Sequence, residues 1–498
     1  MSIADIIMSV DNFVWGPILV IFSLGSGLLF SIALKFPQIR LFKEMINVSF
    51  KNNKAEVGIT PFQALSIAIG GRVGTGNITG TASAIMFGGP GAVFWMVAMG
   101  VVCSASAYVE SALAQVWKQR VEGEYAGGPS FYMDKGLKSK SAAAFYGLVS
   151  VVFLIIFAGV QTNAFGTVVS TNFNISPIVI AILYTLLLVV VIFGGAKVIA
   201  NVADKVVPFM SVLYIAVALV LIIFNIGKVP AMFSIIFTSA FSTNAVFGGI
   251  VGSAVSWGVR RGVFSNEAGL GTGAWVAGSS EVSHPAKAGL SQAFSVFISI
   301  LICMATALMI LVTDTYSVVN PDGGFIVEYI SGSYDIFAVA AVDSLVNGFG
   351  TIFITIAMFL FTFTTIMAYS MYLSRIYYYF FGNRIHDKRV KWVNIGINIA
   401  TVIVAFFGPL VNPTTIWSLA SALCGLLSLV NLACLILLYK PAVATLKDYE
   451  RQLKEGIDPV FIPENCHIEH ADLWHEIISE DYADELKVYN KAFPGEKA

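Results

Sequence analysis

The sequence predicts an all-α polytopic membrane protein with eleven transmembrane helices. Apolar residues make up 57% of the 498-residue chain and charged residues only 12%, about half of the roughly 25% that soluble domains carry. The mean hydropathy is +0.80. So few charges could not cover the surface of a soluble protein this large, which excludes a soluble enzyme, a nucleic-acid-binding protein and a disordered chain.

Eleven apolar segments are long enough to cross a bilayer, which takes a helix of about 20 residues. The first follows an N-terminus without a basic region or a cleavage site, so we expect an uncleaved span there and no signal peptide. Residues 41–50 mix apolar and polar positions at helical spacing and predict a short interfacial helix. The eleven segments are residues 13–35, 60–88, 90–117, 143–169, 176–197, 205–227, 245–280, 287–313, 344–376, 392–410 and 414–438.

The basic residues orient the bundle. Loops on one side of the eleven segments carry eighteen Lys and Arg residues, whereas Lys228 alone lies on the other side. Because basic loops stay in the cytoplasm, we expect an N-terminus outside and a C-terminus inside, in the plasma or inner membrane of a cell. The eighteen are Lys35, Arg40, Lys43, Lys51, Lys54, Lys118, Arg120, Lys135, Lys138, Lys140, Lys197, Lys205, Lys287, Arg375, Arg384, Lys388, Arg389 and Lys391.

The formal net charge of −1 is the sum of two unlike parts. Residues 440–498 hold 7 basic and 13 acidic residues, net −6, whereas residues 1–439 hold 22 basic and 17 acidic residues, net +5. We therefore expect a membrane body followed by an acidic cytoplasmic tail.

The order of the segments predicts an internal repeat. A peripheral helix and the interfacial helix occupy residues 1–59, and two sets of five spans follow at 60–227 and 245–438. An odd number of spans in each half places the halves in opposite orientations, as in an inverted repeat. The first span of each half is rich in glycine: AIGGRVGTGNITGTA at 68–82 and RGVFSNEAGLGTGA at 261–274. Such paired, Gly-interrupted segments indicate the binding site of a secondary transporter.

A helix broken inside the membrane exposes amide N–H groups at one new terminus and carbonyl groups at the other. The amides attract a carboxylate and the carbonyls can bind Na⁺. The alternative is helix packing, because GNITG at 76–80 also has the GxxxG spacing, but the matching second run favours a site. The residues that could form such an anion-plus-cation site are Gly70, Gly71, Gly74, Thr75, Gly76 and Asn77.

Four runs resemble the alanine/glycine:cation symporter family. They are GGRVGTGNITGTASAIMFGGPGAVFW, QTNAFG at 161–166, RGVFSNEAGLGTG at 261–273 and TFTTIMAY at 362–369, and the similarity continues into the tail. The resemblance implies the leucine-transporter-type fold, in which one peripheral helix precedes a core of five plus five helices. It further implies import of small neutral amino acids by alternating access, with Na⁺ as the coupling ion and no other cofactor. No partner is required beyond the amino acid, Na⁺ and the lipid bilayer.

The more distant leucine-transporter pattern G-x-x-V-G-x-G-N matches residues 70–77. This resemblance implies that carbonyls of Gly70 and Val73 bind Na⁺ together with hydroxyls of Thr364 and Thr365. It also implies that the amides of Thr75 and Gly76 face the substrate carboxylate, with Asn77 near a second ion or the ligand. The further residues expected around the substrate are Phe157, Gln161, Phe165, Phe264, Ser265, Thr365 and Tyr369.

At Tyr369 many members of the family have Trp. The smaller ring could widen the pocket, so a larger neutral amino acid such as glutamine stays open as the substrate, as does H⁺ in place of Na⁺.

A membrane channel is a third possibility, but a channel needs rings of carbonyls or charges, and no repeated filter motif occurs. HExxH, GxSxG and paired-carboxylate motifs are missing from the spans, so we predict no enzymatic activity.

Six ionisable residues fall in or near the spans, where each costs about 2.5–3.5 kcal/mol on insertion scales. We expect Arg72 to form a structural ion pair with a carboxylate such as Glu110 or Glu267. Arg260 and Arg261 fit the topology less well, because they approach the middle of the membrane. Asp204 completes the six.

In the tail, the spacing of Cys466, His467, His470 and His475 matches no common zinc site.

Overall fold

Helices form nearly all of the architecture in the computed structural model, which describes residues 3–51, 55–241 and 246–494. Lys54, residue 245 and residues 495–498 of the tail therefore lie outside the described residues. Nine of the eleven predicted segments contain one long helix each. These are α2 (Pro17–Ala33), α7 (Gly91–Val116), α9 (Lys140–Phe173), α10 (Pro177–Ile192), α11 (Gly195–Phe224), α15 (Pro285–Val312), α17 (Phe349–Phe381), α18 (Lys388–Phe407) and α19 (Pro413–Lys454).

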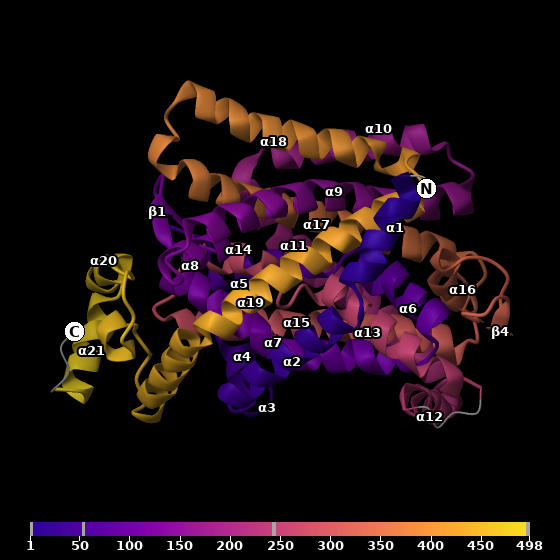
Figure 1. Ribbon diagram of the computed structural model, residues 1–498, viewed down its shortest axis with the longest axis horizontal. Helices are drawn as coiled ribbons and strands as arrows, with labels where there is room; N and C mark the ends of the chain where they lie inside the picture. The colour runs from indigo at the N-terminus through magenta and orange to yellow at the C-terminus, as the bar shows by residue number, and fades with distance from the viewer. Residues whose placement is uncertain (1–2, 52–54, 242–245, 495–498) are drawn as a thin grey trace.

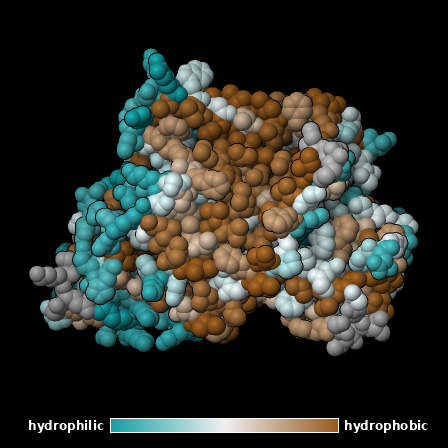
Figure 2. All heavy atoms as spheres, in the orientation of Figure 1, coloured by the Kyte–Doolittle hydropathy of each residue, from teal (hydrophilic) through white to brown (hydrophobic). Residues whose placement is uncertain are grey.

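Within the described part of the chain, eight helical stretches are long and apolar enough to cross a membrane, and α10 is a shorter apolar helix. Figure 2 shows the apolar belt that such helices produce, with hydrophilic residues gathered at the ends of the molecule. Large apolar side chains such as Leu186, Phe209 and Trp392 are exposed on this surface, as expected for chains that face lipid. A multi-pass membrane protein is therefore confirmed, while the count of eleven spans and the inverted repeat remain predictions.

The two glycine-rich segments are broken helices, as predicted. The first begins with α5 (Pro61–Arg72), where Thr60 and Gln63 form a capping box. It unwinds at Val73 and Gly74 and continues through a π-helical turn (Gly76–Gly80) into α6 (Thr81–Gly88). The second consists of α13 (Val251–Asn266) and α14 (Thr272–Ala277), which are separated by a non-helical stretch.

The broken helices lie in the centre of the bundle. Helix α5 packs against α11, α15 and α17, and α13 packs against α6 and α7, while α9 contacts α17, α18 and α19. Figure 1 shows α10 and α18 side by side at one edge of the bundle and α19 running across its face. Backbone breaks are tolerated at this depth because surrounding helices shield them from lipid.

The shorter elements contain the departures from the predicted fold. Helix α12 (Val229–Ala240) occupies the expected linker between the halves, and it is too short to register as a span. Two antiparallel hairpins qualify the all-α prediction: β1 (Gln119–Val121) with β2 (Glu124–Ala126), and β3 (Ser317–Val319) with β4 (Phe325–Glu328). The remaining helices are α1 (Ile3–Val14), α3 (Pro37–Arg40), α4 (Phe42–Phe50), α8 (Pro129–Lys135), α16 (Phe337–Asp343), α20 (Leu473–Glu480) and α21 (Ala483–Ala492).

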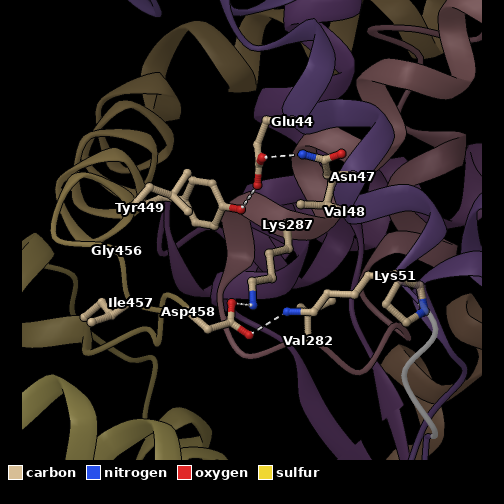
Figure 3. A pocket seen from close by; sticks show the side chains of 12 residues that line it. Glu44, Asn47, Val48, Lys51, Val282, Lys287, Tyr449, Gly456, Ile457 and Asp458 are labelled. Carbon is tan, nitrogen blue, oxygen red and sulfur yellow. Dashed lines mark hydrogen bonds and ion pairs between the residues drawn. The ribbon is translucent and has the colours of Figure 1, made fainter.

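The acidic tail folds back onto the basic loops. Asp458 pairs with Lys51, at 2.8 Å, and with Lys287 at the start of α15, beside a pocket of about 350 Å³ (Figure 3). Further ion pairs of the same kind join Arg40 to Glu450, Arg120 to Glu476 and Lys138 to Glu469. The division of charge seen in the sequence is therefore a contact between two surfaces. Figure 1 places α20 and α21 at one end of the molecule and α1 toward the other, and the orientation in a membrane stays a prediction.

Burial opposes ionisation of Asp458, but Lys287 and Lys51 outweigh it and hold the pKa of that carboxyl below its usual value. Because the unfolded-state pKa of an Asp is about 3.9, this ionic contribution to docking is fully present above that pH. It is lost as the pH falls through the lower, folded-state pKa.

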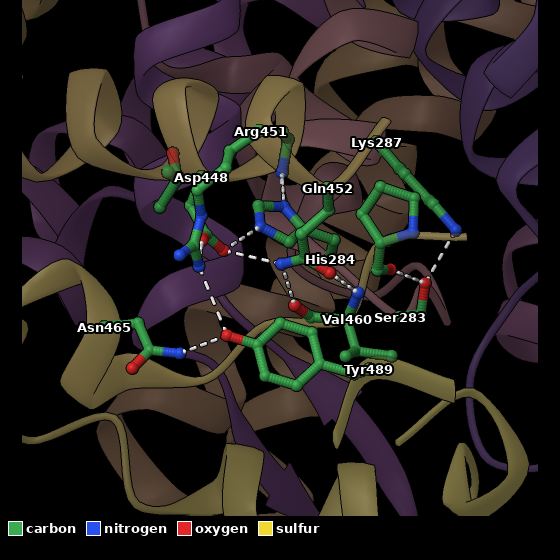
Figure 4. A network of polar contacts seen from close by, with 12 residues as sticks. Ser283, His284, Lys287, Asp448, Arg451, Gln452, Val460, Asn465 and Tyr489 are labelled. Atoms are coloured by element: carbon green, nitrogen blue, oxygen red, sulfur yellow. Dashed lines mark hydrogen bonds and ion pairs between the residues drawn. The ribbon is translucent and has the colours of Figure 1, made fainter. Parts of the chain in front are cut away.

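Polar contacts at the start of α15 strengthen the docking (Figure 4). The Ser283 hydroxyl donates to the carbonyl of Pro459 at 2.7 Å. The side-chain amide of Gln452 donates to Asp448 and to the carbonyl of Val460, both at 2.8 Å, and its oxygen accepts from the Val460 N–H at 3.0 Å. His284 is buried within this network, and its burial lowers its pKa despite Asp448. The tail is thus fixed to the helix end that follows α14.

Trp474 is the residue whose loss should release the tail most. Its ring is fully buried beside Phe461, with 5.1 Å between ring centres, and its indole N–H donates to the carbonyl of Gln115 at 3.0 Å. Trp474→Ala removes packing of about 3–5 kcal/mol, so we expect proteolytic cleavage within 455–493 to accelerate at least about 100-fold. Limited proteolysis of the purified chain measures this, with the exposed Glu480→Ala as the control. Equal cleavage rates in the two variants would contradict the docked arrangement.

Candidate functional site

The break in the first helix is held open by side-chain hydrogen bonds. The Asn77 side chain accepts from the amide of Gly74 at 3.0 Å and donates to the carbonyl and hydroxyl of Ser299 on α15 at 3.2 and 2.9 Å. The amide of Thr75 donates to Oε1 of Gln161 on α9 at 3.1 Å. A Cβ at Gly74 would lie 2.7 Å from the Thr365 hydroxyl and 2.9 Å from Gln161 Oε1. Glycine is therefore required there, because the backbone approaches both α9 and α17.

Backbone carbonyls converge on one hydroxyl beside this break. Thr365 Oγ1 lies 2.9 Å from the carbonyl oxygen of Gly70, 3.5 Å from that of Val73 and 2.9 Å from that of Phe361. The neighbouring Thr364 hydroxyl bonds carbonyls of its own helix, those of Leu360 at 2.9 Å and Phe361 at 3.1 Å, and no bond joins it to Gly70 or Val73 among the described residues. Each of these groups presents an oxygen atom that can coordinate Na⁺, as the unwound helices of transporters do. The residues present therefore fit a sodium ion.

The Phe361 carbonyl is a member of this cluster that sequence reasoning missed. A helical Ser or Thr hydroxyl commonly bonds the carbonyl three or four residues earlier. Once Thr364 and Thr365 were implicated, their spacing from Phe361 was the signal that could have found it.

Aromatic rings close one side of the break. Phe157 on α9 lies 4.6 Å from Phe264 on α13 and 5.4 Å from Tyr369 on α17, measured between ring centres. Phe264 also stacks on Trp417 of α19 at 5.4 Å, a residue that the sequence did not single out. On the same side, a Cβ at Gly76 would lie 2.8 Å from the Ser265 hydroxyl. The structure thus gathers most of the expected pocket residues, all of them buried.

Phe165 lies apart from them. Its ring packs on Tyr184 and Phe359, at 5.4 and 5.7 Å between centres. Each step of four residues along a helix rotates the side-chain direction by about 40°. Two such steps from Phe157 turn Phe165 toward α10 and the outer surface of α17.

The second break brings a carboxyl group to the site. Glu267 has a left-handed backbone conformation (φ +54°) at the end of α13. Its carboxyl accepts hydrogen bonds from the hydroxyls of Tyr369 and, at 2.7 Å, of Thr272. The Tyr369 hydroxyl is thereby turned to Glu267, and its ring remains against Phe157.

Arg72 pairs with Glu110, one of the two expected carboxylates. Its Nη2 lies 3.9 Å from Glu110 Oε1, and both side chains are fully buried. Arg72 Nη1 donates to the carbonyl and side-chain oxygens of Gln292 at 3.1 and 3.0 Å, and also to Ser295. This guanidinium thus connects α5 to α7 and α15.

The two arginines that fitted the topology poorly, both in the second half of α13, have partners. Arg260 pairs with Asp11 of α1. Arg261 lies over the rings of Trp257, at 5.1 Å, and Trp417, at 5.2 Å. Ion pairing and ring contacts reduce the cost of these charges within the bundle.

A hollow of about 320 Å³ opens near the aromatic wall. It is lined by Thr79, Asn163, Asp335 and Trp417, among others, and Trp417 separates it from Phe264. Its lining includes loop residues next to α16, at the end of the molecule away from the tail (Figure 1). The hollow therefore reaches the π-helical turn at Thr79 from the side opposite the tail.

Within the described residues, no group of three or more His, Cys, Asp or Glu side chains is arranged to hold a metal ion. In the tail, Cys466 is buried whereas His467, His470 and His475 are exposed, so their side chains do not converge.

Comparisons with known proteins agree on one kind of molecule. The model of the sodium:alanine symporter family matches residues 1–463. The putative sodium/proton-dependent alanine carrier protein YrbD of Bacillus subtilis is 45% identical over 481 residues, which cover 95% of this chain and 98% of that protein. The probable sodium/glutamine symporter GlnT of Bacillus subtilis is 36% identical over 91% of both chains. The sodium/alanine symporter AgcS of Methanococcus maripaludis is 32% identical, over 90% of this chain and 98% of that protein.

Among solved structures, the transporter MhsT in complex with L-phenylalanine aligns with a TM-score of 0.51 and 14% identity. The alignment covers 88% of this chain and 100% of that chain. At this identity the likeness is one of fold, and it agrees with the leucine-transporter-type fold expected from the sequence.

Proposed function

Because the chain belongs to the sodium:alanine symporter family, we propose that it imports small neutral amino acids, alanine foremost, together with Na⁺. Its relatives are symporters and not enzymes. The observation that carries the proposal is the convergence of the Gly70, Val73 and Phe361 carbonyls on the Thr365 hydroxyl beside the break. Three carbonyls gathered around one hydroxyl suit a dehydrated sodium ion.

The broken α5 would couple ion and substrate. Na⁺ at the carbonyls of Gly70 and Val73 fixes the end of α5, and the amides of Thr75 and Gly76 begin the next helical stretch. These amides and the positive end of that stretch suit the substrate carboxylate. Binding of the ion would thus shape the place where the carboxylate binds.

Gln161 would exchange partners during binding. Its Oε1 accepts from the Thr75 amide, and a buried amide needs an acceptor at all times. A substrate carboxylate would replace this oxygen and free the Gln161 side chain to bond polar groups of the ligand. Asn77 would keep the break open through its bonds to Gly74 and Ser299.

The substrate side chain would meet the rings of Phe157, Phe264 and Tyr369. Relatives are named for alanine and for glutamine, so a larger neutral amino acid is the alternative substrate. H⁺ is the alternative coupling ion. A membrane potential of about 100 mV supplies roughly 2.3 kcal/mol per Na⁺, and a tenfold ratio of Na⁺ concentrations across the membrane supplies about 1.4 kcal/mol. One Na⁺ could therefore sustain about 500-fold accumulation.

Uptake into proteoliposomes tests the proposal. Radiolabelled alanine, glycine and glutamine are each offered with an inward Na⁺ gradient, with equal Na⁺ on both sides, and with no Na⁺. We expect the Na⁺ gradient to drive accumulation, with alanine preferred in a competition panel. Uptake that ignores both Na⁺ and H⁺ gradients would contradict symport.

Asn77→Ala is expected to raise the substrate KM by about tenfold or more. Removing a partner of a buried polar group costs roughly 1–3 kcal/mol, and here the Gly74 amide loses its acceptor. Uptake kinetics measure the change, with Ser170→Ala on α9 as the control because that hydroxyl bonds its own helix. An unchanged KM and Na⁺ dependence would show that the site lies elsewhere.

The proposal includes the topology: eleven spans, with a peripheral helix in 1–59, repeats at 60–227 and 245–438, and a cytoplasmic tail at 440–498. In intact cells a membrane-impermeant thiol reagent should label Asp322→Cys but not Glu480→Cys, which should react only after the membrane is permeabilised. Labelling of both from the same side would contradict it.

A further inference from the structure

Three ionisable side chains meet where the two broken helices pack. Arg72 on α5, Glu110 on α7 and Glu267 in the second break expose 1%, 0% and 2% of their surface. One cation faces two carboxyl groups, so two ionised carboxylates would leave a buried net charge of −1. An uncompensated buried charge costs several kcal/mol, which a proton on one carboxyl removes.

The surroundings of Glu110 favour its ionised form. Its Oε2 accepts from the Gly271 amide at 3.1 Å and from Nδ2 of Asn431 at 3.2 Å, while Oε1 faces Arg72. The Asn431 amide is oriented by the Tyr132 hydroxyl, which donates to its oxygen. These N–H groups can only donate. A proton on Oε2 would therefore lose these hydrogen bonds, and a proton on Oε1 would remove the negative charge that faces Arg72.

Glu267 has different partners. Both are hydroxyls, of Tyr369 and Thr272, and a hydroxyl can donate or accept. As a carboxylate, Glu267 accepts from both; as a carboxylic acid, it can donate to one and accept from the other. Either protonation state is thus satisfied without displacement of a heavy atom.

The ionisable groups that act on Glu267 come from several of the surrounding helices. Arg72 on α5 is the charged one, and the others are Tyr146 on α9, Tyr369 and Tyr372 on α17, and Cys424 on α19. Since Arg72 is matched by Glu110, the second carboxyl is the one left to take up or release a proton.

Glu267 also lies where binding of a proton can affect both the second break and the wall of the expected substrate pocket. It forms the left-handed end of α13, at the junction with α14. Its partner Tyr369 packs against Phe157 of the pocket wall. The carboxyl is therefore one side chain away from the expected substrate.

We propose that Glu267 is a proton-binding site of the transport cycle, an inference that rests on the proposed symport function. The proton passes from external water to a carboxyl oxygen of Glu267 and leaves from that oxygen to cytoplasmic water when the substrate is released. One O–H bond forms and the same bond breaks, and no oxidant or reductant takes part. Each amino acid thus enters with a proton, in addition to Na⁺ at the carbonyl site.

Substrate-evoked acidification tests this. The full chain is reconstituted in vesicles that contain a pH-sensitive dye, with equal Na⁺ on both sides, and alanine is added outside. We expect the wild type to acidify the lumen, Glu267→Gln to lose at least about tenfold of this rate, and alanine counterflow by Glu267→Gln to become independent of pH. Glu328→Gln, at an exposed carboxyl of β4, should acidify as the wild type does.

Acidification by Glu267→Gln at the wild-type rate overturns the assignment. Na⁺-driven alanine uptake by the wild type without proton entry overturns it too, while the proposed function stands. Absence of any amino-acid uptake by the wild type overturns the function itself.

Thr272→Val provides a second route if Glu267→Gln does not fold. The valine cannot donate to the carboxylate, so the pH midpoint of counterflow should move upward by about one unit, the effect of one lost hydrogen bond. An unchanged midpoint overturns the proposal.

Discussion

Thr365→Val is expected to lower the affinity for Na⁺ by about 10- to 100-fold, which is the effect of losing one hydrogen-bonding group to a charged partner. Valine keeps the shape of threonine but removes the hydroxyl on which the Gly70, Val73 and Phe361 carbonyls converge. The Na⁺ concentration that gives half-maximal alanine uptake measures the change, and Na⁺-induced thermal stabilisation of the purified protein provides an independent reading.

Thr365→Ser is the matched control, because it restores the hydroxyl and removes only a methyl group. It should keep a Na⁺ dependence close to that of the wild type. Equal Na⁺ dependence in the valine and serine variants would place the ion elsewhere.

Arg72→Met should destabilise the protein by about 3–5 kcal/mol, the usual result of removing one partner of a buried ion pair. Methionine fills similar space, so the loss reports the charge left on Glu110, together with the bonds to Gln292 and Ser295. Thermal unfolding in detergent measures it.

The double variant with Arg72→Met and Glu110→Gln separates the two contributions. Since glutamine carries no charge, the double variant should recover part of the lost stability. A double variant that is less stable than Arg72→Met alone would contradict the ion-pair assignment.

The positions of the breaks could be predicted from the sequence because glycine reports on the backbone. Gly74 stands where a Cβ would meet Thr365 and Gln161, and glycine weakens a helix wherever it occurs. The resemblance to a known family supplied the other residues of the proposed sodium site, without Phe361. That carbonyl could have been found only from its position three and four residues before Thr364 and Thr365 on the same helix.

Contacts between side chains on different helices could not be predicted in the same way. Whether Arg72 meets Glu110 or Glu267 depends on how α5, α7 and α13 are rotated. The same holds for Phe165, which lies one helical turn from Gln161 and yet packs away from the site. Similarly, the charge count predicted a separate acidic tail, but not that its Asp458 bridges Lys51 and Lys287.

The most direct test of cation-coupled amino-acid symport is the entry of radiolabelled sodium into proteoliposomes when alanine is added, with the membrane potential clamped at zero. We expect alanine to evoke sodium entry in the wild type and little in Thr365→Val. Alanine entry without any accompanying sodium or proton would contradict the account.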